Sequence, residues 1–236
     1  MEKKKTGIGI GKGSQYTYKT PMGLTKRILY SRREGGVVTA IVAGHFGYGK
    51  SAYCLKVAYQ IYKELGYNVD EAWIKALDSI VFEPSEFGRK LKNLKKKAEI
   101  IILDDASVHV GSDLFRINPK KYTAYKQVLT TIRTKTHSIL YNCPNPEELT
   151  KFVRKSDSYN IFITKVGDKY RRRATAWEWH RLQTKGGLRR IQVKRWMDNF
   201  SCYIPSQYYA IYLEKRKGYI KKPIKNLIRE GEKDDK

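Results

Sequence analysis

Cysteines and acidic residues are scarce in this chain of 236 residues, and long apolar runs are absent. The three cysteines, Cys54, Cys143 and Cys202, are widely spaced and form no CxxC pair, and the four histidines are scattered. This pattern argues against a disulfide framework and against a zinc cluster. No apolar run approaches the about 18 residues of a transmembrane helix, and the charged, glycine-containing start has no apolar stretch typical of a signal peptide. We therefore expect an intracellular protein without a membrane span.

Positive charge dominates the composition. Lys and Arg number 48 against 23 Asp and Glu, which gives a formal net charge of +25. Residues 151–236 hold 23 basic and 9 acidic residues, whereas residues 1–150 hold 25 and 14. A purely solubilising charged surface would balance the two signs more closely, so the excess indicates a polyanionic partner, with DNA as the main candidate. Single- and double-stranded DNA remain equally open.

Hydrophobic runs alternate with helical patterns along much of the chain. Continuous β-branched runs such as Val37–Ala43 are typical of strands buried on both faces. Strands that alternate with helices predict an α/β fold with a mainly parallel sheet and helices on both faces. The expected strands are 37–43, 79–82, 99–103, 138–141 and 160–166, and the expected helices are 51–65, 84–97, 121–134 and 146–154.

Three regions differ in composition. Residues 1–34 are rich in Gly, Lys and Tyr with weak periodicity, and we expect a basic, loosely packed arm there. Residues 35–165 carry the alternating pattern of the core. Residues 166–236 are expected to form a basic extension, with two strands joined by a turn at 185–187 and a Tyr-rich helix over 206–218.

A phosphate loop follows the first strand. The segment from Gly44 to Ser51 matches GxxxxGK[ST] in full, between a buried strand and a helix. Backbone N–H groups of such a loop wrap a phosphate, Lys50 reaches the β- and γ-phosphates, and the Ser51 hydroxyl is placed to bind Mg²⁺. The sequence therefore predicts a site for ATP and Mg²⁺. The nucleotide-binding residues are Gly44, His45, Phe46, Gly47, Tyr48, Gly49, Lys50 and Ser51.

Polar residues follow the strands expected over 99–103 and 138–141. Asp104 follows a buried strand, as expected for a magnesium-binding carboxylate, and Asp105 is a candidate base that polarises the attacking water. Alternatively, Asp105 caps the following segment. Asn142, at the tip of the next strand, either senses the terminal phosphate or forms an Asx turn before Pro144.

The phosphate loop and the apolar strand ending in two aspartates resemble the additional-strand P-loop ATPases, which include AAA+ proteins, RecA-like motors and FtsK/HerA motors. The segment 100–105 is similar to that of DnaA-type initiators and DnaC/IstB-type helicase loaders. Compact size, basicity and richness in Lys, Ile and Tyr look like ATPases of archaeal viruses and plasmids. The tail lacks the helical lid pattern of AAA+ proteins, and in this it is similar to Zot-type assembly ATPases.

This resemblance implies ATP hydrolysis in a homo-oligomer. In such assemblies an arginine of a neighbouring subunit often supplies charge to the transition state. Arg133 and Arg154 are the candidates because each lies close in sequence to the strand expected over 138–141. The alternative for Arg154 is a solvated helix end.

Basic and aromatic residues alternate in the C-terminal extension. Basic side chains bind phosphates without sequence preference, and aromatic rings stack on unpaired bases. Strand alternation places Trp177 and Trp179 on one face, where they serve either as core or as a stacking platform. The expected nucleic-acid-binding residues are Arg171, Arg172, Arg173, Arg189, Arg190, Lys194 and Arg195.

The function expected from these features is a Mg²⁺-dependent ATPase that acts on DNA, in replication initiation, helicase loading or DNA translocation of a virus or plasmid. The alternative is a viral DNA-packaging or virion-assembly ATPase of the HerA/FtsK or Zot kind. Possible further partners are replication or virion proteins. A small-molecule kinase leaves the positive charge unexplained, and a nucleotide-dependent DNA-binding protein without turnover is a further hypothesis.

Overall fold

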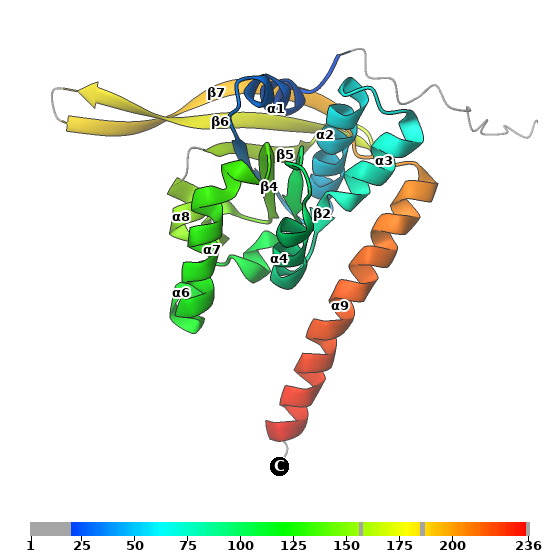
Figure 1. The fold of residues 1–236 in the computed structure, drawn as a ribbon, viewed down its shortest axis with the longest axis vertical. Helices are drawn as coiled ribbons and strands as arrows, with labels where there is room; N and C mark the ends of the chain where they lie inside the picture. The colour runs from blue at the N-terminus through cyan, green and yellow to red at the C-terminus, as the bar shows by residue number, and fades with distance from the viewer. Residues whose placement is uncertain (1–19, 156–157, 185–186, 235–236) are drawn as a thin grey trace, which may run out of the picture.

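The computed structural model describes residues 20–155, 158–184 and 187–234. Seven strands form one sheet in the order β2-β3-β4-β1-β5-β6-β7 (Figure 1). Strands β1 to β5 run parallel, whereas β6 pairs antiparallel with both β5 and β7. The expected α/β fold with a mainly parallel sheet is confirmed. The strands are β1 (Val38–Ala43), β2 (Ile80–Val81), β3 (Ile101–Leu103), β4 (Ser138–Cys143), β5 (Ser158–Lys165), β6 (Arg171–Thr184) and β7 (Gly187–Ser201).

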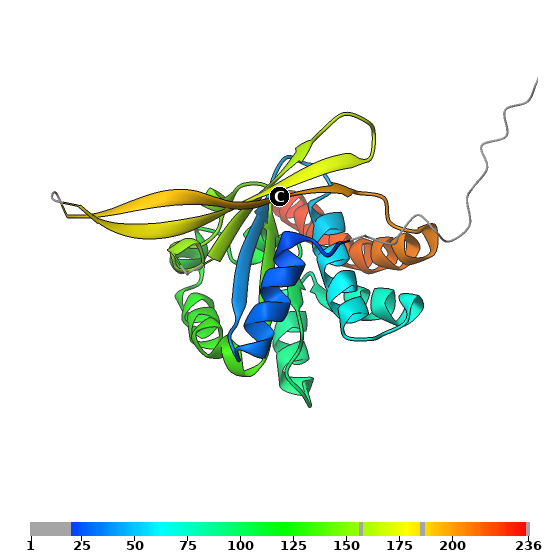
Figure 2. The ribbon, with the colours of Figure 1, turned by 90° about the horizontal axis from the view of Figure 1, so that it is seen from above.

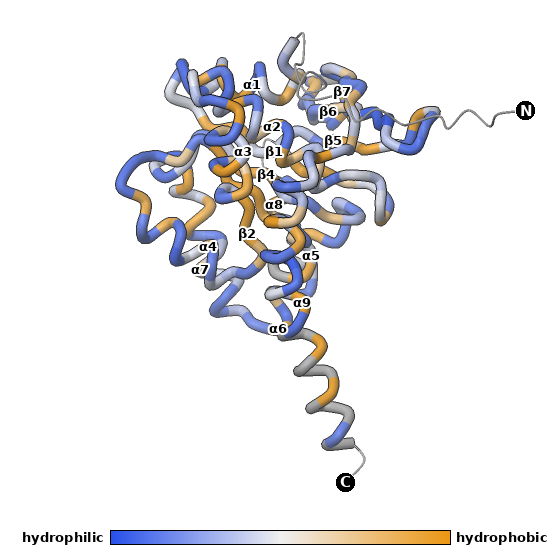
Figure 3. The backbone as a smooth tube through the Cα atoms, turned by 90° about the vertical axis from the view of Figure 1, so that its right-hand side faces the viewer, coloured by the Kyte–Doolittle hydropathy of each residue, from blue (hydrophilic) through white to orange (hydrophobic). Residues whose placement is uncertain are grey.

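Helices cover both faces of the sheet. One buried cluster joins the sheet to α1, α2, α3 and the start of α9, and a second joins it to α4, α7 and α8. Strand β1 serves both clusters because Ala40 and Val42 face the first, and Ile41 and Ala43 face the second. Figure 3 shows the apolar segments gathered inside the body. The helices are α1 (Gly23–Arg33), α2 (Lys50–Glu64), α3 (Val69–Asp78), α4 (Pro84–Asn93), α5 (Ala106–His109), α6 (Leu114–Ile117), α7 (Pro119–Thr131), α8 (Lys151–Lys155) and α9 (Ser206–Asp234).

Strand order brings the three polar motifs together. Strand β4 lies between β1 and β3, so the carboxyl ends of all three strands meet at one edge of the sheet. Val42 of β1 is the partner of Asn142 in β4. The phosphate loop after β1 and the aspartates after β3 therefore lie on either side of Asn142.

Part of the expected N-terminal arm is a packed helix instead. Helix α1 buries Leu24, Thr25 and Ile28 completely. The Gly23 N–H donates to Asp198 Oδ1 at 2.9 Å, which ties the helix to β7. The expectation of loose packing is wrong for this part. The helix has few apolar residues besides Leu24, Ile28 and Leu29, and Met22 at its N-cap has no capping side chain, so the sequence marks it weakly. Residues 1–19 of the expected arm lie outside the described residues.

The two expected C-terminal strands are much longer than their apolar patterns. Strand β5 pairs with β6 only as far as Glu178. Beyond that point, residues 179–184 and 187–192 continue as a two-stranded ribbon that projects from the body (Figure 2). Two residues of the expected turn, 185 and 186, lie outside the described residues.

Helix α9 begins at Ser206 as expected but runs on to Asp234, so the expected end near Gly218 is wrong. Its first turns pack on the body, where the Tyr208 ring stacks on Trp73 with centroids 5.3 Å apart. The distal half extends away from the body (Figures 1 and 3). In the described part of the chain, no helix has the length and apolar character needed to cross a bilayer.

Candidate active site

The phosphate loop is held tightly at two glycines. Gly44 has φ +147° and Gly49 has φ +88°, conformations that favour glycine. A Cβ on Gly44 would lie 2.7 Å from the Ile163 carbonyl oxygen, and a Cβ on Gly49 would lie 2.7 Å from Cys202 Cβ. The loop is therefore confined between β5 and the segment that follows β7.

Lys50 is the first residue of α2, and it is folded onto the loop. Its Nζ donates to the Gly44 carbonyl oxygen at 2.8 Å and to the His45 carbonyl oxygen at 3.2 Å. Burial lowers the pKa of the ammonium. The Phe46 ring is 79% exposed, and its centroid lies 5.4 Å from Lys50 Nζ. The lysine therefore lies beside the N-terminus of α2, where free backbone N–H groups and the helix dipole attract anions.

Ser51, Asp104 and Asn142 form one hydrogen-bonded cluster below the loop. The Ser51 hydroxyl donates to Asp104 Oδ1 at 3.0 Å, and Asn142 Nδ2 donates to Ser51 Oγ at 2.9 Å and also to Asp104. Asp104 is almost completely buried, and burial followed by the neighbouring Asp105 raises the pKa of its carboxyl. A buried carboxylate beside a hydroxyl is the oxygen donor set that Mg²⁺ prefers.

Asp105, the residue after Asp104, lines a cavity beside the phosphate loop. Its backbone has φ +50° and ψ +43°, and it is the single non-glycine residue with positive φ in the described part of the chain. Asp105 occupies the N-cap position of α5, as the alternative has it, but its side chain makes no capping hydrogen bond there. One carboxylate oxygen instead lies 3.4 Å from Arg216 Nη2. Such strained backbone is common where a side chain must be aimed at a ligand.

Helix α9 completes the site with residues that the sequence did not reveal. The Tyr212 hydroxyl donates to Asp104 Oδ2 at 2.9 Å, and burial raises the pKa of Tyr212, which keeps it a donor. Arg216, one turn further, pairs with Asp105. A cavity of about 510 Å³ lies between the phosphate loop and this helix. Its walls include Lys50, Ser51, Asp105, Asn142, Tyr203, Tyr209, Tyr212 and Arg216.

The expected nucleic-acid-binding residues separate into two groups. Arg172 is buried, and its Nε donates to the Tyr48 carbonyl oxygen at 3.1 Å, so it supports the phosphate loop. Arg173 Nε donates to Asn199 Oδ1, and Arg195 Nε pairs with Glu178 at 2.5 Å. The exposed basic residues are Arg171, Arg189, Arg190, Lys194 and Arg195.

Neither candidate arginine for a neighbouring site lines the nucleotide cavity. Arg154, in α8, pairs with Glu147 and donates from Nε to the Leu149 carbonyl oxygen at 3.0 Å. Arg133 is exposed in the short 3₁₀ helix Ile132–Thr134, before the amino end of β4 and thus at the opposite edge of the sheet. The structure brings neither of them to the phosphate loop of its own chain.

The tryptophans of the extension also separate. Trp179 is 39% exposed, so the interpretation of this residue as core is wrong. Trp177 is half-buried and belongs to neither buried cluster. Trp196 packs against Tyr159 with ring centroids 4.8 Å apart. As expected from strand alternation, Trp177 and Trp179 lie on one face of β6, and Ala174 and Ala176 lie on the other face, where they join the first buried cluster.

No family model matches this chain. An uncharacterized protein of Sulfolobus spindle-shape virus 1 is 28% identical over 220 residues, which cover 90% of this chain and 87% of the relative. An uncharacterized protein of Acidianus two-tailed virus is 28% identical over 159 residues, 64% of this chain and 53% of that protein. The chain thus spans about half the length of the second relative.

Three solved structures are similar with low TM-scores. The flagellar accessory protein FlaH of Methanocaldococcus jannaschii is 19% identical, with a TM-score of 0.35 and coverage of 67% of this chain and 84% of that one. The N-terminal domain of zonular occludens toxin from Neisseria meningitidis is 13% identical, with a TM-score of 0.37 and coverage of 75% and 98%. A KaiC-like protein of Pyrococcus horikoshii is 14% identical, with a TM-score of 0.34 and coverage of 67% and 92%. Sequence similarity therefore reaches proteins of two archaeal viruses.

Proposed function

We propose that this protein is a Mg²⁺-dependent ATPase of the additional-strand P-loop class that acts on DNA. The observation that carries the proposal is the hydrogen-bonded cluster of Ser51, Asp104 and Asn142 below a complete phosphate loop. Asp105 and Arg216 line the cavity beside the same loop. The position of β4 between β1 and β3 supports the additional-strand class.

Binding of the nucleotide uses the loop and the start of α2. The backbone N–H groups and Lys50 take the β- and γ-phosphates, and Ser51 with Asp104 provides oxygen ligands for Mg²⁺. Bound there, the cation neutralises phosphate charge during transfer. Tyr203 and Tyr209 are 39% and 44% exposed at the cavity wall, where their rings offer stacking surfaces for the base.

Hydrolysis uses the residues at the carboxyl ends of β3 and β4 together with α9. Asp105 polarises the attacking water, and Asn142 Oδ1, which is buried and has no hydrogen-bond partner among the described residues, helps to orient it. Arg216 stabilises charge on the transferred phosphoryl group. Arg133 and Arg154 were candidates for this role at the site of a neighbouring subunit. Arg216 instead fills the role within its own chain, beside Asp105.

DNA binding rests on the excess of positive charge and on its exposure. The exposed residues Arg171, Arg190, Lys194 and Arg195 contact phosphates without reading sequence. The fold with such a charge distribution favours a role in replication initiation, helicase loading or DNA translocation of a virus or plasmid, in a homo-oligomer.

The test is phosphate release from ATP with Mg²⁺, with and without single- or double-stranded DNA, at two salt concentrations. We expect turnover that rises with DNA, falls with salt, and disappears in Lys50→Ala and after chelation of Mg²⁺. DNA binding without turnover in the wild type would contradict the ATPase. Turnover that is indifferent to DNA would contradict the DNA role and favour the virion-assembly alternative, whose activator is a protein.

A further inference from the structure

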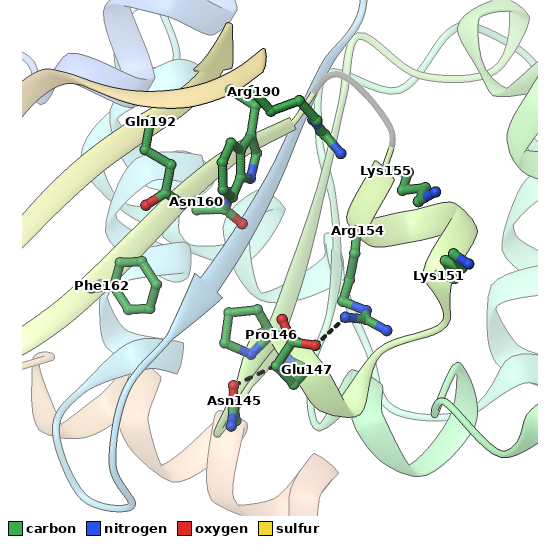
Figure 4. Close-up of a pocket in the computed structure, with 11 residues that line it drawn as sticks. Asn145, Pro146, Glu147, Lys151, Arg154, Lys155, Asn160, Phe162, Arg190 and Gln192 are labelled. Carbon is green, nitrogen blue, oxygen red and sulfur yellow. Dashed lines mark hydrogen bonds and ion pairs between the residues drawn. The ribbon is translucent and has the colours of Figure 1, made fainter. Parts of the chain in front are cut away.

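A second cavity, of about 330 Å³, lies between α8 and the ribbon (Figure 4). Asn160 and Phe162 of β5 form its floor, whereas their neighbours Tyr159 and Ile161 face the buried cluster under α1 and α2. The second buried cluster contains no residue of β5, β6 or β7, so among the described residues α8 is the helix that packs on this face of the three strands. We call this cavity the groove.

Basic side chains line both sides of the groove. Lys151, Arg154 and Lys155 come from α8, and Arg190 comes from β7 on the other side (Figure 4). Glu147 is the one acidic side chain in the lining, and it is paired with Arg154. The groove therefore carries a net positive charge and attracts a polyanion.

Aromatic side chains are exposed within this basic lining. Trp179 is 39% exposed and Phe162 is 37% exposed. The Arg190 guanidinium carbon lies 5.0 Å from the centroid of the Trp179 ring, so a planar cation and an aromatic face are stacked in the groove wall. A duplex hides the faces of its bases, whereas a single strand offers them for stacking on such side chains.

The groove continues along one face of the ribbon. The register pairs Trp179 with Gln192 and Arg181 with Arg190, so these four side chains share the face that opens to the groove. Arg189, the partner of Leu182, lies on the opposite face. The adjacent residues Arg189 and Arg190 carry the same charge but lie on opposite faces of the ribbon. Replacing each in turn therefore compares the two faces.

The groove and the nucleotide cavity share one short segment. Asn142 contacts Ser51 and Asp104, and two residues later the Pro144 carbonyl oxygen accepts the Gly44 N–H at 3.1 Å. Asn145 then lines the groove. Asn142 at the nucleotide cavity and Asn145 at the groove are therefore only three positions apart in the chain.

We propose that the groove binds single-stranded DNA, with the backbone phosphates on the α8 cations and Arg190, and a base stacked on Trp179. This inference rests on the proposed function and specifies which form of DNA the protein holds, and where. The interface then includes the exposed residues Lys151 and Lys155 and the half-buried Arg154. The sequence alone assigned none of these three residues a role in nucleic-acid binding.

The test is fluorescence anisotropy of a labelled oligothymidine without nucleotide, on the full chain. Trp179→Ala is expected to raise Kd by about 5- to 150-fold, the effect of losing one stacked base. Arg190→Ala is expected to raise Kd about tenfold, whereas Arg189→Ala, the matched control on the other face, changes it about twofold or less. The intrinsic tryptophan fluorescence of the wild type should fall on binding and fall less in Trp179→Ala.

Equal weakening by Arg189→Ala and Arg190→Ala would overturn the proposal, as would tighter binding of a duplex together with indifference to Trp179→Ala. Phosphate release on the same preparations separates this inference from the proposed function. DNA-stimulated hydrolysis that survives both Trp179→Ala and Arg190→Ala contradicts the groove and leaves the ATPase. Groove-dependent binding without hydrolysis contradicts the ATPase and leaves the groove.

Discussion

Two regions meet at the nucleotide cavity, and they contribute to it in different ways. The parallel strands β1 to β5 supply contiguous motifs, an eight-residue loop and an adjacent pair of aspartates. The C-terminal elements β6 to α9 supply single residues from far along the chain. Arg172 contacts the loop across 124 residues, Tyr212 reaches Asp104 across 108, and Arg216 reaches Asp105 across 111. Under the proposed function, the first region binds the nucleotide, and the second region lines the other side of the cavity and supplies Arg216 for catalysis.

The strongest test of this difference is Arg216→Ala. If α9 supplies the charge for phosphoryl transfer, turnover should fall by about 10³-fold or more, with nucleotide affinity much less affected. Phosphate release measures the first quantity, and titration with a fluorescent ATP analogue measures the second. Lys217→Ala removes the same charge from the next, exposed residue and should leave turnover unchanged. Equal turnover in the two variants would place all the chemistry in the parallel strands.

Asp105→Asn tests the catalytic residue that the first region offers. Loss of a positioned base should lower turnover by about 10²- to 10⁴-fold. Asparagine tolerates the left-handed backbone found at this position, so the fold is kept. Single-turnover phosphate release is the measurement, and a turnover close to the wild-type value would show that Asp105 only positions Arg216.

Gly49→Ala probes the contact between the loop and the segment after β7. The alanine at position 49 would have an unfavourable positive φ, and its Cβ would collide with Cys202 Cβ. At position 47 the φ is similar, +73°, but the new Cβ would meet no atom within 4 Å. We expect Gly47→Ala to cost about 1–2 kcal/mol and Gly49→Ala about 1–3 kcal/mol more. Urea unfolding of both variants gives the difference. Equal costs would mean that the C-terminal segment does not confine the loop.

Tyr212→Phe should have the smallest effect of the four. It removes a hydrogen bond to the buried Asp104 carboxylate, which costs about 1.5–3 kcal/mol. For a chain of this size, each kcal/mol lowers Tm by about 2–4 °C. Tyr209→Phe, at an exposed position on the same helix, is the control in the calorimetric melt. A Tm difference within error between the two variants would show that α9 does not hold Asp104 in solution.

The division between the regions also explains what the sequence predicted. Strand, loop and helix around Lys50 follow from local pattern, and strand order then brings Asp104 and Asn142 to the loop, as expected. Arg216 is one of 48 basic residues, and no local signal separates it from the others. Its role depends on the path of a helix that starts far along the chain.

Two other features, the burial of Arg172 and the length of α9, do have signals in the sequence. Alternation with Ala174 and Ala176, both buried, places Arg172 on the inner face of β6, unlike Arg171 and Arg173. The continuation of α9 beyond Gly218 is marked by isoleucines four residues apart at Ile220, Ile224 and Ile228. A single glycine costs a helix only about 1 kcal/mol, which helix length and packing of the first turns offset.

The most direct test of the central claim, that α9 completes the site of its own chain, is a mixing experiment. Lys50→Ala keeps Arg216, and Arg216→Ala keeps the phosphate loop, so each inactive protein holds what the other lacks. Phosphate release is measured for the two proteins mixed in equal amounts with ATP, Mg²⁺ and DNA. The account predicts no turnover beyond the sum of the separate variants. Recovery of turnover in the mixture would contradict it, because Arg216 would then act on the site of a neighbouring subunit.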